Sequence, residues 1–186
     1  MLSEVKIKKE EVVLVDEENN VLKTVLKSEV HSEDTPLHRA FSSFIFNGNG
    51  DLLIQQRSHK KKTWPMVWSN TCCGHPSLDE NNIEAATRRL EEELGIGVEE
   101  LEEVSPYRYQ FVQNGIMENE ICPILVGFTK DNPKINDNEV ENTQWIRWED
   151  FLRETNIYPG KYSPWCMEQA KILNKNKRFR EIRKAK

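Results

Sequence analysis

The feature that most constrains the fold of this chain is an amphipathic pattern near its middle. Apolar residues recur there close to the 3.6-residue period of an α-helix, at Ile83, Ala86, Leu90 and Leu94. Asn82 can cap the start of such a helix, and Gly95 stands where helices commonly end in a left-handed residue. The pattern therefore predicts a helix over residues 82–94 that packs one face against a core.

Segments with the composition of β-strands lie on both sides of this helix. Two of them flank the polar turn EENN and predict an N-terminal hairpin. Two more flank NGNG, where Asn and Gly supply the positive φ angles of a tight turn. The predicted strands cover residues 11–16, 21–26, 40–46, 51–57, 106–112, 118–128 and 141–148. With further helices expected from about Asp150 and over 164–183, the sequence predicts an α+β fold, a mixed β-sheet flanked by helices.

Length and charge limit the classes of protein that this chain can be. Its 186 residues fit a single domain over 1–186. The net charge is −5, and outside the basic stretch Lys171–Lys186 the chain lacks the broad basic surface of a nucleic-acid-binding protein. The basic stretch itself is interpreted as a solvated helix end. No run of apolar residues is long enough to span a membrane and no signal peptide is evident, so we expect a cytoplasmic protein.

The four cysteines are best interpreted as reduced thiols. They are Cys72, Cys73, Cys122 and Cys166, and two of them are adjacent. No pair has the C-x-x-C spacing of a zinc site, and the chain is neither short nor evidently secreted, as disulfide-rich domains are. The ordinary role of such residues is that of small buried apolar side chains.

The predicted central helix carries three consecutive glutamates. With Leu90 at the centre of the buried stripe, Glu93 lies about 60° away at the border of that stripe, and Glu92 falls almost opposite. Arg89 lies one turn before Glu93 on the same side of the helix. Glu93 is therefore the acid that we expect to face inward, although an ordinary solvated helix face has a similar composition.

From Gly74 the sequence reads GHPSLDENNIEAATRRLEEELGI, which resembles the Nudix box, G-x5-E-x7-R-E-U-x-E-E-x-G-U, where U is apolar. The positions in register are Gly74, Glu80, Arg88, Leu90, Glu92, Glu93, Gly95 and Ile96. Arg89 departs from the pattern, because it replaces the first glutamate of the core, a metal ligand in typical Nudix hydrolases. The replacement removes a hard oxygen ligand, which argues against metal-assisted hydrolysis, and an arginine is well suited to hold a diphosphate.

Several further segments resemble type I isopentenyl-diphosphate isomerase, an enzyme family with the Nudix fold. They are HRAFSSFIFN, QQRSHKKKTWPMVWSNTCCGHP, YRYQF with GIMENEICP, and YSPW, and the resemblance runs from about Lys27 to about Gln169. It implies an α/β/α sandwich with a Nudix core over about 36–170, an N-terminal extension over 1–35 and a C-terminal helix over about 164–186. It also implies a monomer or homodimer that converts isopentenyl diphosphate to dimethylallyl diphosphate in isoprenoid biosynthesis, through a carbocation-like state.

The resemblance implies the residues that move protons. Cys73 matches the family's catalytic cysteine, and Cys72 is the alternative thiol. Glu120 matches the opposing catalytic acid, with Tyr109 assisting it by a hydrogen bond. Since side chains alternate along a strand, the segment ENE places Glu118 and Glu120 on one face.

The resemblance also implies two metal sites and a substrate site. One divalent ion, Mn²⁺, Mg²⁺ or Zn²⁺, is expected on His31, His38, His75, Glu118 and Glu120, since mixed nitrogen and oxygen ligands suit these ions. A second ion, Mg²⁺, is expected between Glu93 and the substrate diphosphate. The substrate-binding residues implied are Lys27, Arg57, Lys61, Arg89 and Trp165, the last through its π-face. His59 has no counterpart and is expected at the surface.

Two other functions compete with this interpretation. A Nudix hydrolase of a nucleoside diphosphate derivative is supported by Glu92 and Glu93 but opposed by Arg89. A non-catalytic module that binds a prenyl or nucleotide diphosphate would not need both Cys73 and Glu120. The presence of both residues favours the isomerase.

Overall fold

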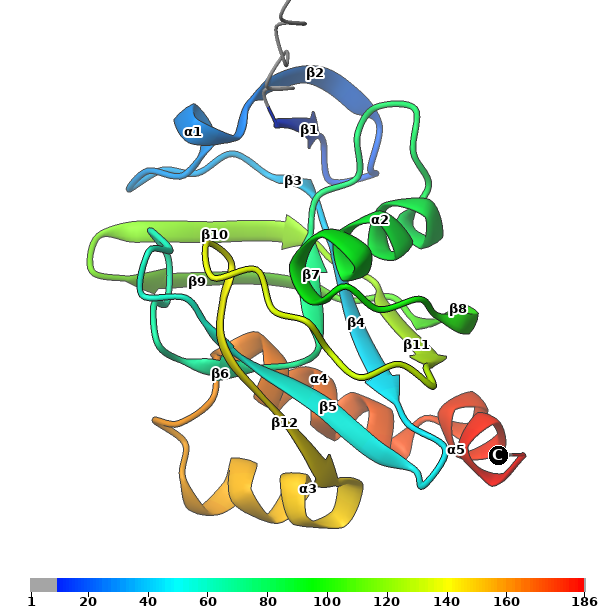
Figure 1. Ribbon diagram of the computed structural model, residues 1–186. Coiled ribbons are helices and arrows are strands. Elements are labelled where there is room, and N and C mark those ends of the chain that lie inside the picture. Colours follow the sequence, from blue (N-terminus) through cyan, green and yellow to red (C-terminus); the bar gives the residue numbers. More distant parts are fainter. Residues whose placement is uncertain (1–9, 186) are drawn as a thin grey trace, which may run out of the picture.

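Two β-sheets form the frame of the computed structural model, which describes residues 10–185 (Figure 1). The first has the strand order β2-β1-β3-β10-β9, and the second has the order β12-β5-β4-β11-β8, with β6 paired to β5 and β7 paired to β4. The strands of the first sheet are β1 (Glu11–Val15), β2 (Val21–Leu26), β3 (His38–Arg39), β9 (Arg108–Gln113) and β10 (Ile116–Ile121). The strands of the second are β4 (Phe41–Phe46), β5 (Asp51–Arg57), β6 (Trp68–Ser69), β7 (Cys72–Gly74), β8 (Glu99–Ser105), β11 (Ile124–Phe128) and β12 (Val140–Arg147). The antiparallel pair β1–β2 confirms the predicted N-terminal hairpin.

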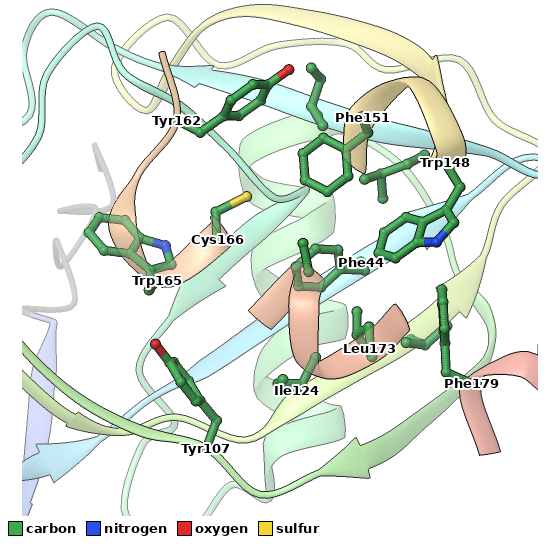
Figure 2. Close-up of a cluster of buried hydrophobic side chains, with 14 of the residues drawn as sticks. Phe44, Tyr107, Ile124, Trp148, Phe151, Tyr162, Trp165, Cys166, Leu173 and Phe179 are labelled. Carbon is green, nitrogen blue, oxygen red and sulfur yellow. The ribbon is translucent and has the colours of Figure 1, made fainter. Parts of the chain in front are cut away.

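Helices cover both faces of the second sheet. Its strand β4 is buried along its whole length, and successive side chains face opposite cores: Ile45 packs with α2, whereas Phe44 packs with α3 and α4. Figure 2 shows the second of these cores, in which Phe44 lies among Trp148, Phe151 and Leu173. The helices are α1 (Lys27–Val30), α2 (Asn82–Leu94), α3 (Trp148–Ile157), α4 (Pro164–Lys175) and α5 (Lys177–Lys184). The layers confirm the predicted α+β class with mixed sheets flanked by helices, although the strands form two sheets and not one.

Helix α2 confirms the predicted central helix but begins differently. Its N-cap is Asn81 and not Asn82, because the Asn81 side chain accepts hydrogen bonds from the backbone N–H groups of Ile83 and Glu84. The Glu84 carboxylate in turn accepts from the Asn81 backbone N–H, which completes a capping box. The helix ends at Gly95, whose φ of 60° is the left-handed conformation that glycine adopts most easily.

The prediction of one strand over 118–128 is wrong, because this segment contributes to both sheets. Strand β10 ends at Ile121 and β11 begins at Ile124. Pro123, between them, has no backbone N–H to donate to a sheet ladder. The carbonyl of Pro123 instead accepts from the N–H of Ser42, at 3.0 Å. The chain thus passes here from the first sheet to the second, and both sheets can contribute to one site.

The prediction of one C-terminal helix over 164–183 is also wrong, because Asn176 separates α4 from α5. Its side chain accepts from the backbone N–H of Phe179, which starts α5, and donates to the carbonyl of Val104 in β8.

Strand β8 was not predicted from the sequence, since EELEEVS is dominated by acidic residues that ordinarily disfavour strands. Among the described residues, no helix has both the length and the apolar character that crossing a bilayer requires.

Candidate active site

A cavity of about 740 Å³ opens beside the point where the two sheets meet. Its wall includes Cys73 and His75 from β7 and the residue after it, Tyr109 from β9, Glu120 from β10 and Trp165 from α4. A cavity of this size suits a small ligand, since such sites commonly measure about 300–1,000 Å³. The residues that were predicted to move protons are therefore gathered in one place.

Strand β7 decides which of the two adjacent thiols faces the cavity. It pairs antiparallel with β4, with Cys73 opposite Ser42 and Cys72 opposite Ser43. Because side chains alternate along a strand, Cys73 lines the cavity, whereas Cys72 is fully buried in the core beneath α2. Of the two candidate thiols, the structure directs Cys73 to the cavity.

The Cys73 sulfur is surrounded by hydrogen-bonding groups. Its Sγ lies 3.2 Å from Asn70 Nδ2 and 3.3 Å from each of Asn70 Oδ1 and Ser42 Oγ. Burial raises the pKa of Cys73 to about 11, although hydrogen bonds from Ser42 and Asn70 oppose the change. The sulfur is therefore a protonated thiol near neutral pH.

Glu120 and Tyr109 face each other across β10 and β9, where they are direct partners in the antiparallel register. The Tyr109 hydroxyl donates to Glu120 Oε2 at 2.5 Å. Glu118 and Glu120 are both buried, whereas Asn119 between them is partly exposed, which confirms the alternation expected for the segment ENE. Burial by itself would raise the pKa of Glu120, but the imidazoles of His38 and His75 beside Oε1 outweigh it and hold the pKa well below its usual value.

Three histidines converge on Glu120. The ring centroids of His31, His38 and His75 lie 5.1–5.8 Å apart. One ligand atom from each histidine and one from Glu120 lie within 4.8 Å of one another, a group that could hold a metal ion. Glu118 adjoins it, with Oε2 lying 3.0 Å from His31 Nε2.

The donor set of this histidine cluster fits a divalent cation. The buried atoms His31 Nε2, His38 Nε2 and Glu118 Oε2 have no hydrogen-bond partner, which is costly unless another group binds them. His38 Nδ1 lies 2.8 Å from the carbonyl of Pro36, an acceptor that keeps the proton on Nδ1 and leaves Nε2 free to coordinate. Burial lowers the pKa of His75 to about 4, so its ring is neutral, as a metal ligand must be.

Basic side chains form a second part of the cavity wall. Lys27, Arg57 and Lys61, which were predicted to bind substrate, all line it. Lys27 Nζ lies 2.9 Å from Glu10 Oε2, and Lys61 pairs with Glu139. Arg57 donates to the carbonyls of Thr63 and Trp64, so its guanidinium is held in place by backbone groups. Its carbon Cζ lies 5.5 Å from the centre of the Trp165 ring.

Arg89 and Glu93 do not line the cavity, although Arg89 forms ion pairs with Glu10 and Glu139, which do. Both are buried, with 6% and 2% of their surfaces exposed, so the inward orientation predicted for Glu93 is confirmed. Arg89 donates to Glu93 Oε1 from Nε at 3.1 Å and from Nη2 at 2.5 Å. The carboxylates of Glu10, Glu92 and Glu139 also lie within 4 Å of the guanidinium. That Arg89 binds the diphosphate and Glu93 binds Mg²⁺ stays a prediction.

Trp165 is 2% exposed and packs between two other aromatic residues. Its ring is stacked on Tyr109 at 5.8 Å and meets Trp64 edge-on at 5.2 Å. Its indole Nε1 is buried without a hydrogen-bond partner. An electron-rich face is therefore held rigidly beside the thiol and the carboxylate.

His59 forms an exposed pair with Glu141, as expected of a surface residue.

Sequence reasoning missed the residues that support the thiol from behind. Asn70, Ser42 and Gln169 carry no motif of their own, and each is fully buried. Only the position of Asn70, three residues before Cys73, could have drawn attention to it. Glu10 and Glu139 were also missed, because their roles depend on basic residues far away in the sequence.

A protein-family model described as the NUDIX domain matches residues 36–166. Solved structures with the same architecture include DR0079 from Deinococcus radiodurans, with a TM-score of 0.67, 21% identity and coverage of 87% of this chain and 98% of that one. The MutT protein from Methanosarcina mazei Go1 has a TM-score of 0.59 and 18% identity, and covers 76% of this chain and 97% of that one. At these identities the likeness concerns the fold alone. The family model, which matches more than half of the chain, shows that it is a NUDIX domain protein.

Curated relatives resemble the chain over nearly its whole length. The isopentenyl-diphosphate Delta-isomerase of Saccharopolyspora erythraea is 49% identical over 166 residues, which cover 88% of this chain and 86% of that protein. The protein of the same name from Escherichia coli O6:H1 is 42% identical over 172 residues, which cover 91% and 94%. The chain therefore belongs to the isopentenyl-diphosphate Delta-isomerase family within the NUDIX domain proteins.

Proposed function

We propose that this chain is an isomerase that converts isopentenyl diphosphate to dimethylallyl diphosphate in isoprenoid biosynthesis. The observation that carries the proposal is a single cavity that presents the Cys73 thiol and the Glu120 carboxylate together. A 1,3 proton shift requires two such groups, because C4 of the substrate must gain a proton and C2 must lose one. A hydrolase would need only an activated water and would have no use for the thiol.

The cavity wall suits the two ends of this substrate. The basic groups of Lys27, Arg57 and Lys61 favour a diphosphate, for which charge-assisted hydrogen bonds are the strongest available contacts. The rings of Trp165 and Tyr109 favour the five-carbon chain. Between the two proton transfers the substrate carries positive charge at C3, and the π-face of Trp165 can stabilise it by about 2 kcal/mol where water is excluded.

Tyr109 and the histidine cluster hold Glu120 in place for its part in the reaction. The Tyr109 hydroxyl fixes Oε2, while His38 Nε2 and His75 Nε2 lie 3.4 and 3.2 Å from Oε1. A divalent ion, for which we propose Mn²⁺, Mg²⁺ or Zn²⁺, would supply positive charge that polarises the carboxyl group. The residues that would hold it are His31, His38, His75, Glu118 and Glu120.

We further propose that Mg²⁺ accompanies the substrate diphosphate. Glu93 is the acidic residue expected to contact this ion. Arg89 donates to Glu93 Oε1, whereas Oε2 has only a weak contact from Gln55 Nε2 at 3.4 Å, so Oε2 is the oxygen proposed for the role. Lys27, Arg57 and Lys61 would neutralise the remaining phosphate charge.

The proposal is tested by incubating the protein with isopentenyl diphosphate and Mg²⁺, following dimethylallyl diphosphate by proton NMR and assaying released phosphate in parallel. The wild type is expected to isomerise the substrate without releasing phosphate. Cys73→Ala should lose at least 10³-fold in rate, on the order expected when a proton-transfer group is removed. Cys72→Ala is the matched control, since it removes the neighbouring thiol from the opposite face of β7 and should keep its rate.

Each other outcome points to a different function. Phosphate release without isomerisation would mean that the protein is a hydrolase. Turnover that survives in Cys73→Ala but not in Cys72→Ala would mean that Cys72, and not Cys73, is the reacting thiol. An absence of turnover with Mg²⁺, Mn²⁺ and Zn²⁺ would favour a module that binds a diphosphate without reacting with it.

A further inference from the structure

We propose that the hydroxyl of Ser42, oriented by Gln169, positions the Cys73 thiol and donates a hydrogen bond to its sulfur as the sulfur gives up its proton. The proposal rests on the isomerase function proposed above. Ser42 is a positioning residue, because it lies behind the sulfur and does not line the cavity. Its role would be to hold the reacting sulfur and to stabilise the negative charge that develops on it.

The backbone places Ser42 directly behind the thiol. Ser42 and Cys73 are register partners on the antiparallel strands β4 and β7, and Ser42 Oγ lies 3.3 Å from Cys73 Sγ. Strand β4 lies inside the second sheet and is buried along its whole length, so it is a rigid support. Ser42 itself is fully buried, and water therefore does not compete for its hydroxyl.

Gln169 controls the direction of the Ser42 hydroxyl. This glutamine comes from α4, is fully buried, and donates from Nε2 to Ser42 Oγ at 2.9 Å. A serine hydroxyl has one hydrogen to donate and two lone pairs that accept. Because Gln169 uses one lone pair, the hydroxyl hydrogen points away from Gln169, toward the side on which the sulfurs lie.

Two sulfurs compete for that hydrogen, since Cys122 Sγ also lies 3.3 Å from Ser42 Oγ. Cys122 is fully buried in the core, whereas Cys73 is partly exposed and lines the cavity. A neutral thiol is a weak acceptor, and a sulfur that has lost its proton accepts a charge-assisted hydrogen bond. The hydroxyl therefore turns to Cys73 when that sulfur becomes negative, which is the stage at which the bond strengthens.

Asn70 supplies a second donor to the same sulfur. Its Nδ2 lies 3.2 Å from Cys73 Sγ and also contacts the backbone carbonyls of Ser43 and Cys72, at 3.1 and 3.0 Å. These carbonyls accept only, so they fix the orientation of the amide. Because the amide has two hydrogens for these three acceptors, Cys73 Sγ shares one of them with a carbonyl. Ser42 and Asn70 together hold two donors toward a sulfur whose charge changes during the reaction, an arrangement that lowers the barrier more than it strengthens substrate binding.

The test compares two neighbouring serines in the isomerase assay. Ser42→Ala should lower kcat about tenfold, as expected for loss of one charge-assisted hydrogen bond, with KM changed less than twofold. Ser42→Thr keeps the hydroxyl and should restore most of kcat. Ser43→Ala is the matched control, because its hydroxyl donates to the carbonyl of Cys72 on the other face of β4 and has no contact with Cys73 Sγ.

Gln169→Met tests the second part of the proposal, since methionine has a similar volume but no N–H donor. It should lower kcat several-fold in the wild type and have no further effect in Ser42→Ala, because Gln169 acts only through Ser42. This variant also keeps the proposal testable if Ser42→Ala fails to fold. A wild-type kcat in Ser42→Ala, an equal loss in Ser43→Ala, or additive losses in the double variant would overturn the proposal. An inactive wild type would instead refute the proposed function.

Discussion

Replacement of Arg89 by methionine should destabilise the fold strongly. Charged residues on helices are usually exposed and contribute little, but Arg89 is buried. Arg89 supplies two hydrogen bonds to Glu93 Oε1, and no other cation among the described residues forms an ion pair with Glu93. Methionine keeps much of the apolar stem that packs near Gly74 but removes the guanidinium. Glu93, only 2% exposed, would then be a buried carboxylate without a counter-charge.

The expected cost follows from that unpaired charge. Removing one partner of a buried ion pair typically costs about 3–5 kcal/mol. The lower end applies here, because Gln55 Nε2 lies 3.4 Å from Glu93 Oε2 and offers weak compensation. For a chain of this length, about 3 kcal/mol corresponds to a fall of roughly 6–12 °C in Tm.

Urea denaturation followed by circular dichroism measures this loss of unfolding free energy. Arg88→Met is the matched control, because Arg88 pairs with Glu80 near the surface, where such a pair contributes about 1 kcal/mol or less. The double variant Arg89→Met with Glu93→Gln should recover part of the stability, since it also removes the unpaired charge. An unfolding free energy for Arg89→Met within 1 kcal/mol of the wild type would refute the reasoning.

Three further predictions concern the metal, a close contact and pH. Adding Mn²⁺ or Zn²⁺ to chelator-treated protein should raise Tm through the histidine cluster, with about 2.7 kcal/mol of stabilisation at one hundred times Kd; His38→Ala should abolish the shift, and an equal shift in that variant would contradict the site. Gly74→Ala should lower the free energy of unfolding, measured by urea denaturation, by about 1–3 kcal/mol. The reason is that the new Cβ would lie 3.1 Å from Arg89 Cγ and from two ring atoms of Phe41. Gly48→Ala is the control, because its Cβ would meet nothing within 4 Å. A hydrogen bond from Arg88 lowers the pKa of Glu80 from 4.5 to about 2, so this pair stabilises the fold fully above pH 4.5 and loses its effect as the pH falls toward 2. The wild type should therefore lose stability relative to Glu80→Gln across that interval, and parallel acid unfolding curves would refute the assignment.

The parts of the site that could be predicted from the sequence depend on local patterns. The alternation of side chains along a strand correctly predicted that Glu118 and Glu120 share one face, which is buried. The helical period correctly predicted that Glu93 faces inward. The choice between Cys72 and Cys73 came from resemblance to a family. In the structure it follows from the pairing of β7 with β4, which the sequence did not indicate.

The parts that could not be predicted depend on contacts between distant segments. Glu10 lies far before Arg89 in the sequence and Glu139 lies far after it, and neither is part of a local pattern that indicates an ion pair. Residues 118–128 have strand-like composition throughout, so the sequence predicted one strand where the chain passes from one sheet to the other. Pro123 argued against a continuous strand, because proline rarely lies inside one. Similarly, Asn176 lies in a helix-like stretch, and only its contact with Val104 explains why the helix ends there.

The measurement that tests the central claim most directly is the position of deuterium in dimethylallyl diphosphate formed by the wild-type protein in D₂O. If a protein group adds a proton to C4 and another removes one from C2, proton NMR should show deuterium in the methyl group that derives from C4, and reversal of the reaction should add it at C2. A product formed without deuterium from solvent would contradict the account, because the proton would then have moved within the substrate without the Cys73 thiol and the Glu120 carboxylate exchanging it with water.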